Sequence, residues 1–329
     1  MIIAPFDRIV SIGKSGIFVP LDHYSAASQG GVDITSGSVK TTRQPFHAAL
    51  HNRCSLNLSG MIGRTCGGEV PSMKTSAFVR SLDWNSLKEG DCLTAAQSRQ
   101  VDAFAIETLG VGSLILMEHA ARSAVEWLLQ HAGCRGRTAP AEAPEKADLP
   151  PTFWILCGRG NNGGDGFAMA RLLLVTGHSV RVFATHPQEE MSPDAQANAS
   201  ILQTLGIPLE SIASFLNEAA TLQPSDWIID ALLGTGQTRP LTGELAEVVT
   251  AINDSSAQVL AIDLPTGFPA DHGPAAEDEC CVIAHATITF VSPKQGFLNP
   301  LAHRFLGETH IASIGLPHDQ LLAAVRGRE

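Results

Sequence analysis

The chain has 329 residues, of which 44% are apolar and 17% are charged, and its formal net charge at pH 7 is -11. This composition predicts a soluble globular protein of one large or two ordinary domains, and the acidic balance argues against a nucleic-acid partner. No apolar run is long enough to span a bilayer, and seven cysteines without a CxxC pair predict a reducing, cytoplasmic location and no zinc site.

The first ninety residues are predicted to be a poorly ordered extension, because the segment 24–60 is rich in Ser, Thr and Gly and has weak periodicity. No secretory signal pattern is present. One alternative is sequence lying upstream of a true start at Met73. Another is an organellar targeting peptide, although Asp7, Asp22 and Asp33 are unusual in such peptides. Residues 1–90 are assigned no function, and the folded domain is predicted over residues 91–329.

Two helices are predicted at the start of this domain. Thr94 and Gln97 have the spacing of a capping box, which predicts a helix from about residue 95 to residue 107. After a Gly-Val-Gly break, apolar residues recur at helical spacing from Met117 to Leu128 and predict a second helix. The Pro- and Ala-rich segment 137–151 is predicted to be a surface loop.

From residue 152 onward, apolar strand-like runs alternate with helical segments. The helices are predicted after Gly164, between Ser192 and Gly206, and after Thr242. The strand-like runs are "FWILC", "VRVFAT", "WIIDALL", "QVLAIDL", "ATITFV" and "HIASIG". This alternation predicts an α/β fold with a doubly wound, mostly parallel sheet that is covered on both faces.

Unusual polar stretches follow four of these strands. They are "GRGNNGGDG", "THPQEEMSP", "DALLGTGQTRP" and "DLPTGF". Ligands of open parallel sheets bind at the carboxyl ends of the strands. The four stretches therefore predict a binding site at that edge.

The stretch "GRGNNGGDG" contains a GxGxxG pattern, which alone is a weak sign of a dinucleotide site. A nicotinamide site also needs an acid at the end of the second strand, and none occurs before Glu189. A tight turn explains the glycines but not Asn161 and Asn162, whose amides can bond a phosphate, a ribose or a cation. Asp165 could either belong to the site or complement the helix dipole.

Two carboxylates follow later strands in the same way. Asp230 could cap a turn or present its charge at the mouth of a crevice, and both interpretations stay open. The loop from Gly234 to Pro240 could hold a phosphate, with Arg239 adding positive charge. Asp263 lies three residues before Thr266. Carboxylate, amide and hydroxyl oxygens at one edge indicate a hard cation, and potassium or sodium fits better than magnesium because one carboxylate is enough.

Five stretches resemble the family of NAD(P)H-hydrate epimerases, also called the YjeF N-terminal domain family. These stretches are "LTAAQSRQVDAFAIETLGVGSLILMEHAARS", "CGRGNNGGDGFAMARLL", "DALLGTGQTRPLTGELAEVVTAIN", "AIDLPTGFPADHG" and "ATITFVSPKQGFLNP". The resemblance runs from Leu93 to about Pro317 in the family's order. It implies a Rossmann-like three-layer α/β/α sandwich and a homodimer.

The resemblance also implies a substrate and a cofactor. The substrate would be hydrated NADH or NADPH, and one potassium ion per subunit would bind Asn162, Asp230 and Thr266. The substrate would contact Asn161, Asn162, Gly163, Gly164, Asp165, Gly234, Thr235, Gly236, Gln237, Thr238, Arg239, Pro240 and Asp263. The family's dehydratase domain is not recognised in the chain, so a separate NAD(P)H-hydrate dehydratase is expected as a partner.

The chain departs from the family pattern at three places. It has Met117-Glu118-His119-Ala120-Ala121 where the family usually has Met-Glu-Asn-Ala-Gly, and Pro265-Thr266-Gly267 where the family usually has Pro-Ser-Gly. Thr266 keeps the hydroxyl group that a cation needs. His186 lies near a position where some members have a lysine that is considered catalytic.

The substrate's chemistry suggests what the catalytic groups must do. Water has added at C6 of the nicotinamide ring, so C6 can lose hydroxide and regain water on its other face, or the ring can open and close again. Either route needs a proton donor and acceptor, and Asp230 is predicted for this role. The resemblance adds His186 as a second catalytic candidate, although a histidine at such a position is more often a surface loop residue. The alternatives are a non-catalytic nucleotide-binding scaffold of the same fold and a nicotinamide oxidoreductase.

Overall fold

The computed structural model describes residues 78–132, 150–237 and 239–326. In this part of the chain eight strands form one sheet in the order β1-β8-β7-β6-β5-β2-β3-β4. Neighbouring strands are parallel except β1, which pairs antiparallel with β8. The strands are β1 (Val79–Ser81), β2 (Thr152–Cys157), β3 (Ser179–Ala184), β4 (Leu209–Ser211), β5 (Trp227–Ala231), β6 (Gln258–Ile262), β7 (Ala286–Phe290) and β8 (Glu308–Ala312). The predicted mostly parallel sheet is confirmed.

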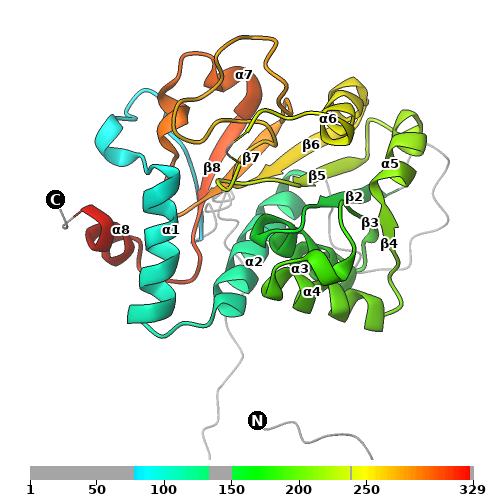
Figure 1. The fold of residues 1–329 in the computed structure, drawn as a ribbon, viewed down its shortest axis with the longest axis horizontal. Helices are drawn as coiled ribbons and strands as arrows, with labels where there is room; N and C mark the ends of the chain where they lie inside the picture. The colour runs from blue at the N-terminus through cyan, green and yellow to red at the C-terminus, as the bar shows by residue number, and fades with distance from the viewer. Residues whose placement is uncertain (1–77, 133–149, 238, 327–329) are drawn as a thin grey trace, which may run out of the picture. The chain divides into compact units, whose positions relative to one another are not determined.

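Helices cover both faces of this sheet (Figure 1). On one face lie α2 (Ser113–His131), α3 (Asn161–Val175) and α4 (Pro193–Thr204). On the other lie α5 (Ile212–Glu218), α6 (Glu244–Asp254) and α7 (Ala302–Leu306), while α1 (Ala95–Ala103) and α8 (His318–Arg326) pack together at the β8 end. The three-layer α/β/α arrangement is therefore confirmed.

The strands are apolar on both faces because both faces are covered. In β2, Phe153 and Ile155 pack toward α2 and α3, whereas Trp154 and Leu156 pack toward α5 and α6. Successive side chains of a strand point to opposite faces, so one continuous apolar run serves two cores. This is the physical reason why the strands could be predicted from uninterrupted apolar runs.

The order of the parallel strands determines where a ligand can bind. The segment β4-β3-β2-β5-β6-β7 has the 3-2-1-4-5-6 order of a Rossmann fold. The direction of winding reverses between β2 and β5, and the loops that follow these two strands diverge at their carboxyl ends. A crevice is therefore expected beside residues 158–160 and 232–237.

Several boundaries differ from the prediction. The domain begins before residue 91, because Val79–Ser81 forms an edge strand that is too short to show periodicity. The first helix passes into a π-helical turn at Phe104–Thr108, and α3 begins at Asn161 rather than after Gly164, because extended Gly160 is its N-cap. Residues 1–77, most of the predicted 137–151 loop and Thr238 lie outside the described residues. None of the helices described is both long and apolar enough to cross a membrane.

Candidate active site

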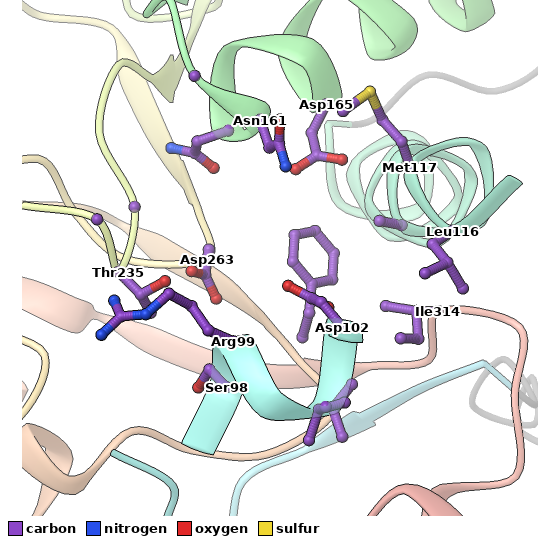
Figure 2. A pocket seen from close by; sticks show the side chains of 18 of the residues that line it. Ser98, Arg99, Asp102, Leu116, Met117, Asn161, Asp165, Thr235, Asp263 and Ile314 are labelled. Atoms are coloured by element: carbon purple, nitrogen blue, oxygen red, sulfur yellow. The ribbon is translucent and has the colours of Figure 1, made fainter. Parts of the chain in front are cut away.

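A cavity of about 500 Å³ opens at the carboxyl edge of the sheet, at the reversal between β2 and β5. Its walls come from α1, α2, the first turn of α3 and the loops after β5, β6 and β7 (Figure 2). The predicted site residues that line it are Asn161, Asn162, Asp165, Gly234, Thr235, Gly236, Gln237 and Asp263. The structure thus gathers segments that are more than 100 residues apart in the chain.

Two glycines allow close backbone approach beside the cavity: Gly158 between the loops after β2 and β5, and Gly163 within the turn from β2 to α3. A Cβ atom on Gly158 would lie 1.8 Å from the carbonyl oxygen of Leu232, and one on Gly163 would lie 1.8 Å from the carbonyl oxygen of Gly158. Gly164 lies beneath the Met117 side chain. Gly163 and Gly164 are buried and support the cavity rather than line it. These two glycines are not among the residues that line the cavity, and their contact with the substrate stays a prediction.

The two asparagines occupy the first turn of α3 but have different surroundings. Asn161 is exposed, and its Oδ1 accepts a hydrogen bond from Ser192 Oγ at 2.9 Å. Both amide atoms of Asn162 are buried and have no hydrogen-bond partner among the described residues. A buried polar group without a partner is costly, so Asn162 is suited to hold a ligand atom.

Asp165 follows on the same helix and lines the cavity. Burial raises the pKa of its carboxyl group well above the usual range, and the charges of Asp263 and Asp102 raise it further. Repulsion between neighbouring carboxylates and removal from water both favour the protonated acid. This carboxyl group is therefore suited to donate a proton.

Asp230 lies beneath the cavity, not on its surface. The residue is fully buried, and Thr266 binds it through its backbone N–H and its hydroxyl group, both at 2.7 Å. Leu232 N–H donates a third hydrogen bond at 3.2 Å. Burial raises the pKa of Asp230 to about 6, although these hydrogen bonds oppose the shift. The predicted catalytic and metal-binding roles of Asp230 stay predictions. Because Asp230 does not line the cavity, a ligand would have to enter beneath the lining residues to contact it.

Thr266 joins Asp230 to the loop after β5. It is fully buried, and its Oγ1 accepts a hydrogen bond from Leu233 N–H at 3.0 Å while donating to Asp230. Gly234, the residue after Leu233, lies against Asn162, because a Cβ atom on Gly234 would be 3.5 Å from the Asn162 amide carbon. The three residues predicted to bind potassium therefore border one loop, residues 232–234. Their side chains carry carboxylate, hydroxyl and amide oxygens, which are ligand types that a monovalent cation accepts, and Asn162 Oδ1 has no hydrogen-bond partner among the described residues.

Lys294 was not predicted as a site residue, but it is one of the residues that line the cavity. Its side chain is 2% exposed, and its Nζ lies 2.8 Å from Asp263 Oδ1 and 2.9 Å from Thr289 Oγ1. The stretch "SPKQG" that carries it follows β7, at the same edge as Asp263. This position in the sequence could have identified Lys294 as a site residue, because polar residues just after a parallel strand lie at this edge of the sheet.

Backbone strain also gathers at the cavity. Asp263 and Val291 both line it and both have φ of 64°, a left-handed conformation that non-glycine residues seldom adopt. Such strain costs about 1–3 kcal/mol per residue and concentrates at functional sites. At Asp263 it turns the chain immediately after β6, and Lys294 holds the resulting carboxylate.

The remaining predicted residues lie at or outside the rim. Gln237 Oε1 accepts a hydrogen bond from Gly267 N–H at 2.9 Å. Arg239 and Pro240 line a neighbouring cavity of about 340 Å³ that shares the Thr235 and Gln237 walls. His186 accepts or donates a hydrogen bond with Thr185 Oγ1 at 2.8 Å and is not among the residues that line the main cavity. Its predicted catalytic role stays a prediction.

Comparison with known proteins identifies the family. Residues 113–296 match the family described as YjeF-related protein N-terminus. A protein named NAD(P)H-hydrate epimerase from Rhodopirellula baltica is 40% identical over 229 residues, covering 70% of this chain and 86% of that protein. The epimerase of the same name from Pirellula staleyi is 36% identical, covering 67% of this chain and 91% of that protein.

Two further matches extend the comparison. A bifunctional NAD(P)H-hydrate repair enzyme from Moorella thermoacetica is 34% identical over 68% of this chain, and the match spans 40% of the longer enzyme. The crystal structure of the yeast protein ynu0 (YNL200c) aligns with a TM-score of 0.51 at 22% identity, covering 64% of this chain and 83% of that one, which supports the fold. The chain therefore belongs to the YjeF-related N-terminal family.

Proposed function

We propose that this protein is an NAD(P)H-hydrate epimerase, which interconverts the R and S epimers of NADH or NADPH hydrated at C6. The observation that carries the proposal is the cavity at the strand-order reversal, in which the Asn162 amide, without a hydrogen-bond partner in the described part of the chain, lies among residues that include several carboxyl groups. Relatives that share 36–40% of their residues with this chain are named for this activity.

The first turn of α3 suits the phosphates of a dinucleotide. Gly160 is the N-cap of this helix and provides no side chain to bond the first N–H groups. These N–H groups and the positive end of the helix dipole favour an anion. Thr235, Gly236 and Gln237 form the facing wall and would hold the remainder of the nucleotide.

The cavity favours epimerisation over hydride transfer. The C6 carbon bears a hydroxyl group beside the ring nitrogen, so its configuration can be inverted by proton transfers with no change in oxidation state. Carboxyl groups with raised pKa values can both donate and accept protons near neutral pH. The proposed activity therefore needs only side chains that the cavity contains.

We also propose one potassium ion per subunit, held by Asn162, Asp230 and Thr266. The buried Asn162 Oδ1 and the fully buried Asp230 carboxylate support this assignment, because a cation would give the amide oxygen a partner and offset the charge of the carboxylate. When bound, the ion would supply positive charge below the nucleotide. Asp230 and Thr266 would keep the loop at 232–234 in place through their mutual hydrogen bonds.

The remaining proposals rest on the sequence resemblance. A homodimer, a cytoplasmic location and a dehydratase partner are expected, and the bifunctional relative, whose name covers NAD(P)H-hydrate repair more broadly, supports a functional link to a second repair step. Such a link is tested by adding a dehydratase and measuring whether R-epimer consumption depends on this protein.

The direct test mixes purified protein with the isolated R epimer of hydrated NADH and follows both epimers by chromatography. We expect the ratio to reach equilibrium much faster than in buffer alone. Asn162→Ala should slow it, whereas Asn217→Ala, which changes an exposed asparagine on α5, should not. Binding without epimerisation would favour the scaffold alternative, and nicotinamide oxidation would favour the oxidoreductase.

A further inference from the structure

Helix α1 places a further carboxyl group, that of Asp102, in the cavity. Asp102 lines the cavity from α1, and Figure 2 shows it pointing into the space that Asp165 enters from α3. Asp102 is open to the solvent in the cavity, whereas Asp165 is half-buried. A ring bound between the two helices would therefore meet a carboxyl group on each side.

The orientation of α1 follows from its amphipathic pattern. Val101 and Ala105 are buried against Leu116 and Ile314, so they fix one face of the helix toward the protein. Ser98, Asp102 and Ile106 recur at helical spacing and face the cavity instead. The direction of Asp102 is thus a consequence of the packing of its neighbours.

The start of α1 is anchored beside Lys294. Leu93 N–H donates to Pro293 O at 2.8 Å, and Gln295 N–H donates to Leu93 O at 2.9 Å. The Thr94 and Gln97 side chains cap the helix reciprocally, and Ala95 N–H donates to Asp271 Oδ1 at 2.6 Å. These bonds hold the helix firmly enough for Asp102 to keep one position over the sheet edge.

The charges around Asp102 leave it able to exchange a proton. Although part of the Asp102 side chain is exposed, the surrounding cavity walls remove enough water from its carboxyl group to raise its pKa to about 6. The charge of Asp263 adds to the rise, and Lys294 opposes it. The other charged groups that line the cavity are Arg99, Arg159, Asp165 and Asp194. Lys294 is already bonded to Asp263, so Asp102 and Asp165 face the cavity without a cation of their own in hydrogen-bond contact among the described residues.

We propose that Asp102 is a catalytic residue of the epimerase, which transfers a proton on one face of the hydrated ring while Asp165 serves the opposite face. This inference rests on the proposed function. An epimerase must break and form the C6–O bond on opposite faces, and two carboxyl groups on opposite walls supply one proton-transfer group for each.

The reaction balances without a co-reactant. The carboxyl group on the hydroxyl side donates its proton to the oxygen as the C6–O bond breaks, and water leaves with that bonding pair. The ring nitrogen's lone pair forms C6=N1, giving an iminium ion. Water then adds from the other face, the C=N π pair returns to nitrogen, and the opposite carboxylate takes the released proton. The pair ends with its proton on the other carboxyl group.

The test follows epimerisation and oxygen exchange together in water enriched in ¹⁸O. Wild-type protein should epimerise both isomers and incorporate ¹⁸O at C6. Asp102→Asn should lower the epimerisation rate at least about 100-fold. It should still exchange the oxygen of the one epimer whose hydroxyl group faces Asp165, because water can leave and return on that side. Asp165→Asn should retain exchange only for the other epimer.

The matched control is Asp254→Asn, which makes the same chemical change at an exposed position at the end of α6. It should behave as the wild type does. Wild-type epimerisation that Asp102→Asn leaves unchanged would overturn the role of Asp102 and preserve the proposed function. Two further results would also overturn the role of Asp102. Loss of exchange for both epimers would indicate a structural role, and wild-type epimerisation without ¹⁸O uptake would indicate ring opening in place of C6–O cleavage. A wild-type protein that epimerises neither isomer would overturn the proposed function and this inference together.

Discussion

Replacing Lys294 with methionine tests whether one buried cation holds the cavity floor together. The lysine Nζ lies 2.8 Å from Asp263 Oδ1 and also donates to Thr289 Oγ1 and to the carbonyl oxygens of Phe290 and Ser292. Methionine has a similar length but cannot donate a hydrogen bond. The variant would leave the Asp263 carboxylate without its cation and three oxygens without this donor.

The expected loss of stability can be estimated from this geometry. Removing one partner of a buried ion pair costs about 3–5 kcal/mol. The Asp263 side chain is 15% exposed and faces the cavity, so water can partly replace the ammonium group, and we expect the lower value, about 3 kcal/mol. With a urea m-value of about 3 kcal/mol/M, the unfolding midpoint would fall by about 1 M.

Urea titrations followed by circular dichroism would measure this shift. Lys88→Met is the matched control, because Lys88 is exposed and its loss should change the free energy of unfolding by no more than about 0.5 kcal/mol. Adding Asp263→Asn to Lys294→Met should recover part of the loss, since the uncompensated charge is then removed. A loss below about 1 kcal/mol for Lys294→Met would show that the buried ion pair contributes no more than an exposed one, and the structural role given to Lys294 would then be wrong.

Three further predictions follow from the same site. Gly163→Ala should lower the free energy of unfolding by about 3 kcal/mol, because the added Cβ would lie 1.8 Å from a backbone oxygen. Gly160→Ala is the control and should cost less than about 1 kcal/mol, because its Cβ would have no atom within 4 Å. Equal effects of the two substitutions in thermal melts would contradict this prediction. Potassium chloride at 100 mM should raise the melting temperature by several degrees relative to N-methylglucamine chloride, because the ion would bind only the folded protein. Asp230→Asn should abolish this difference. The same melting temperature of the wild type in both salts would refute the potassium site. The pKa of Asp102 is raised to about 6, so below that pH the group is protonated and can no longer accept a proton. The background-corrected epimerisation rate should therefore fall as the pH drops from 7 to 5. A constant rate across this range would argue against a catalytic role of Asp102.

Much of the fold followed from local patterns. A buried strand such as β2 needs apolar residues on both faces, and this requirement appears in the sequence as an uninterrupted run. Short elements did not show such patterns: β4 and α7 have too few residues for a period to be recognised, and their form depends on the elements they pack against.

Which residues reach the carboxyl edge could be inferred from the sequence alone, because Asp230 and Asp263 lie at or directly after the ends of parallel strands and Asn162 lies in the first turn of the helix that follows β2. The contacts that each residue makes there depend on tertiary packing. The sharp turn after β5 buries Asp230 beneath residues 232–234, whereas the left-handed backbone at Asp263 turns its carboxylate toward Lys294. The place of Asp102 depends on backbone bonds between Leu93 and a segment about 200 residues later, and no local pattern encodes a contact at that separation.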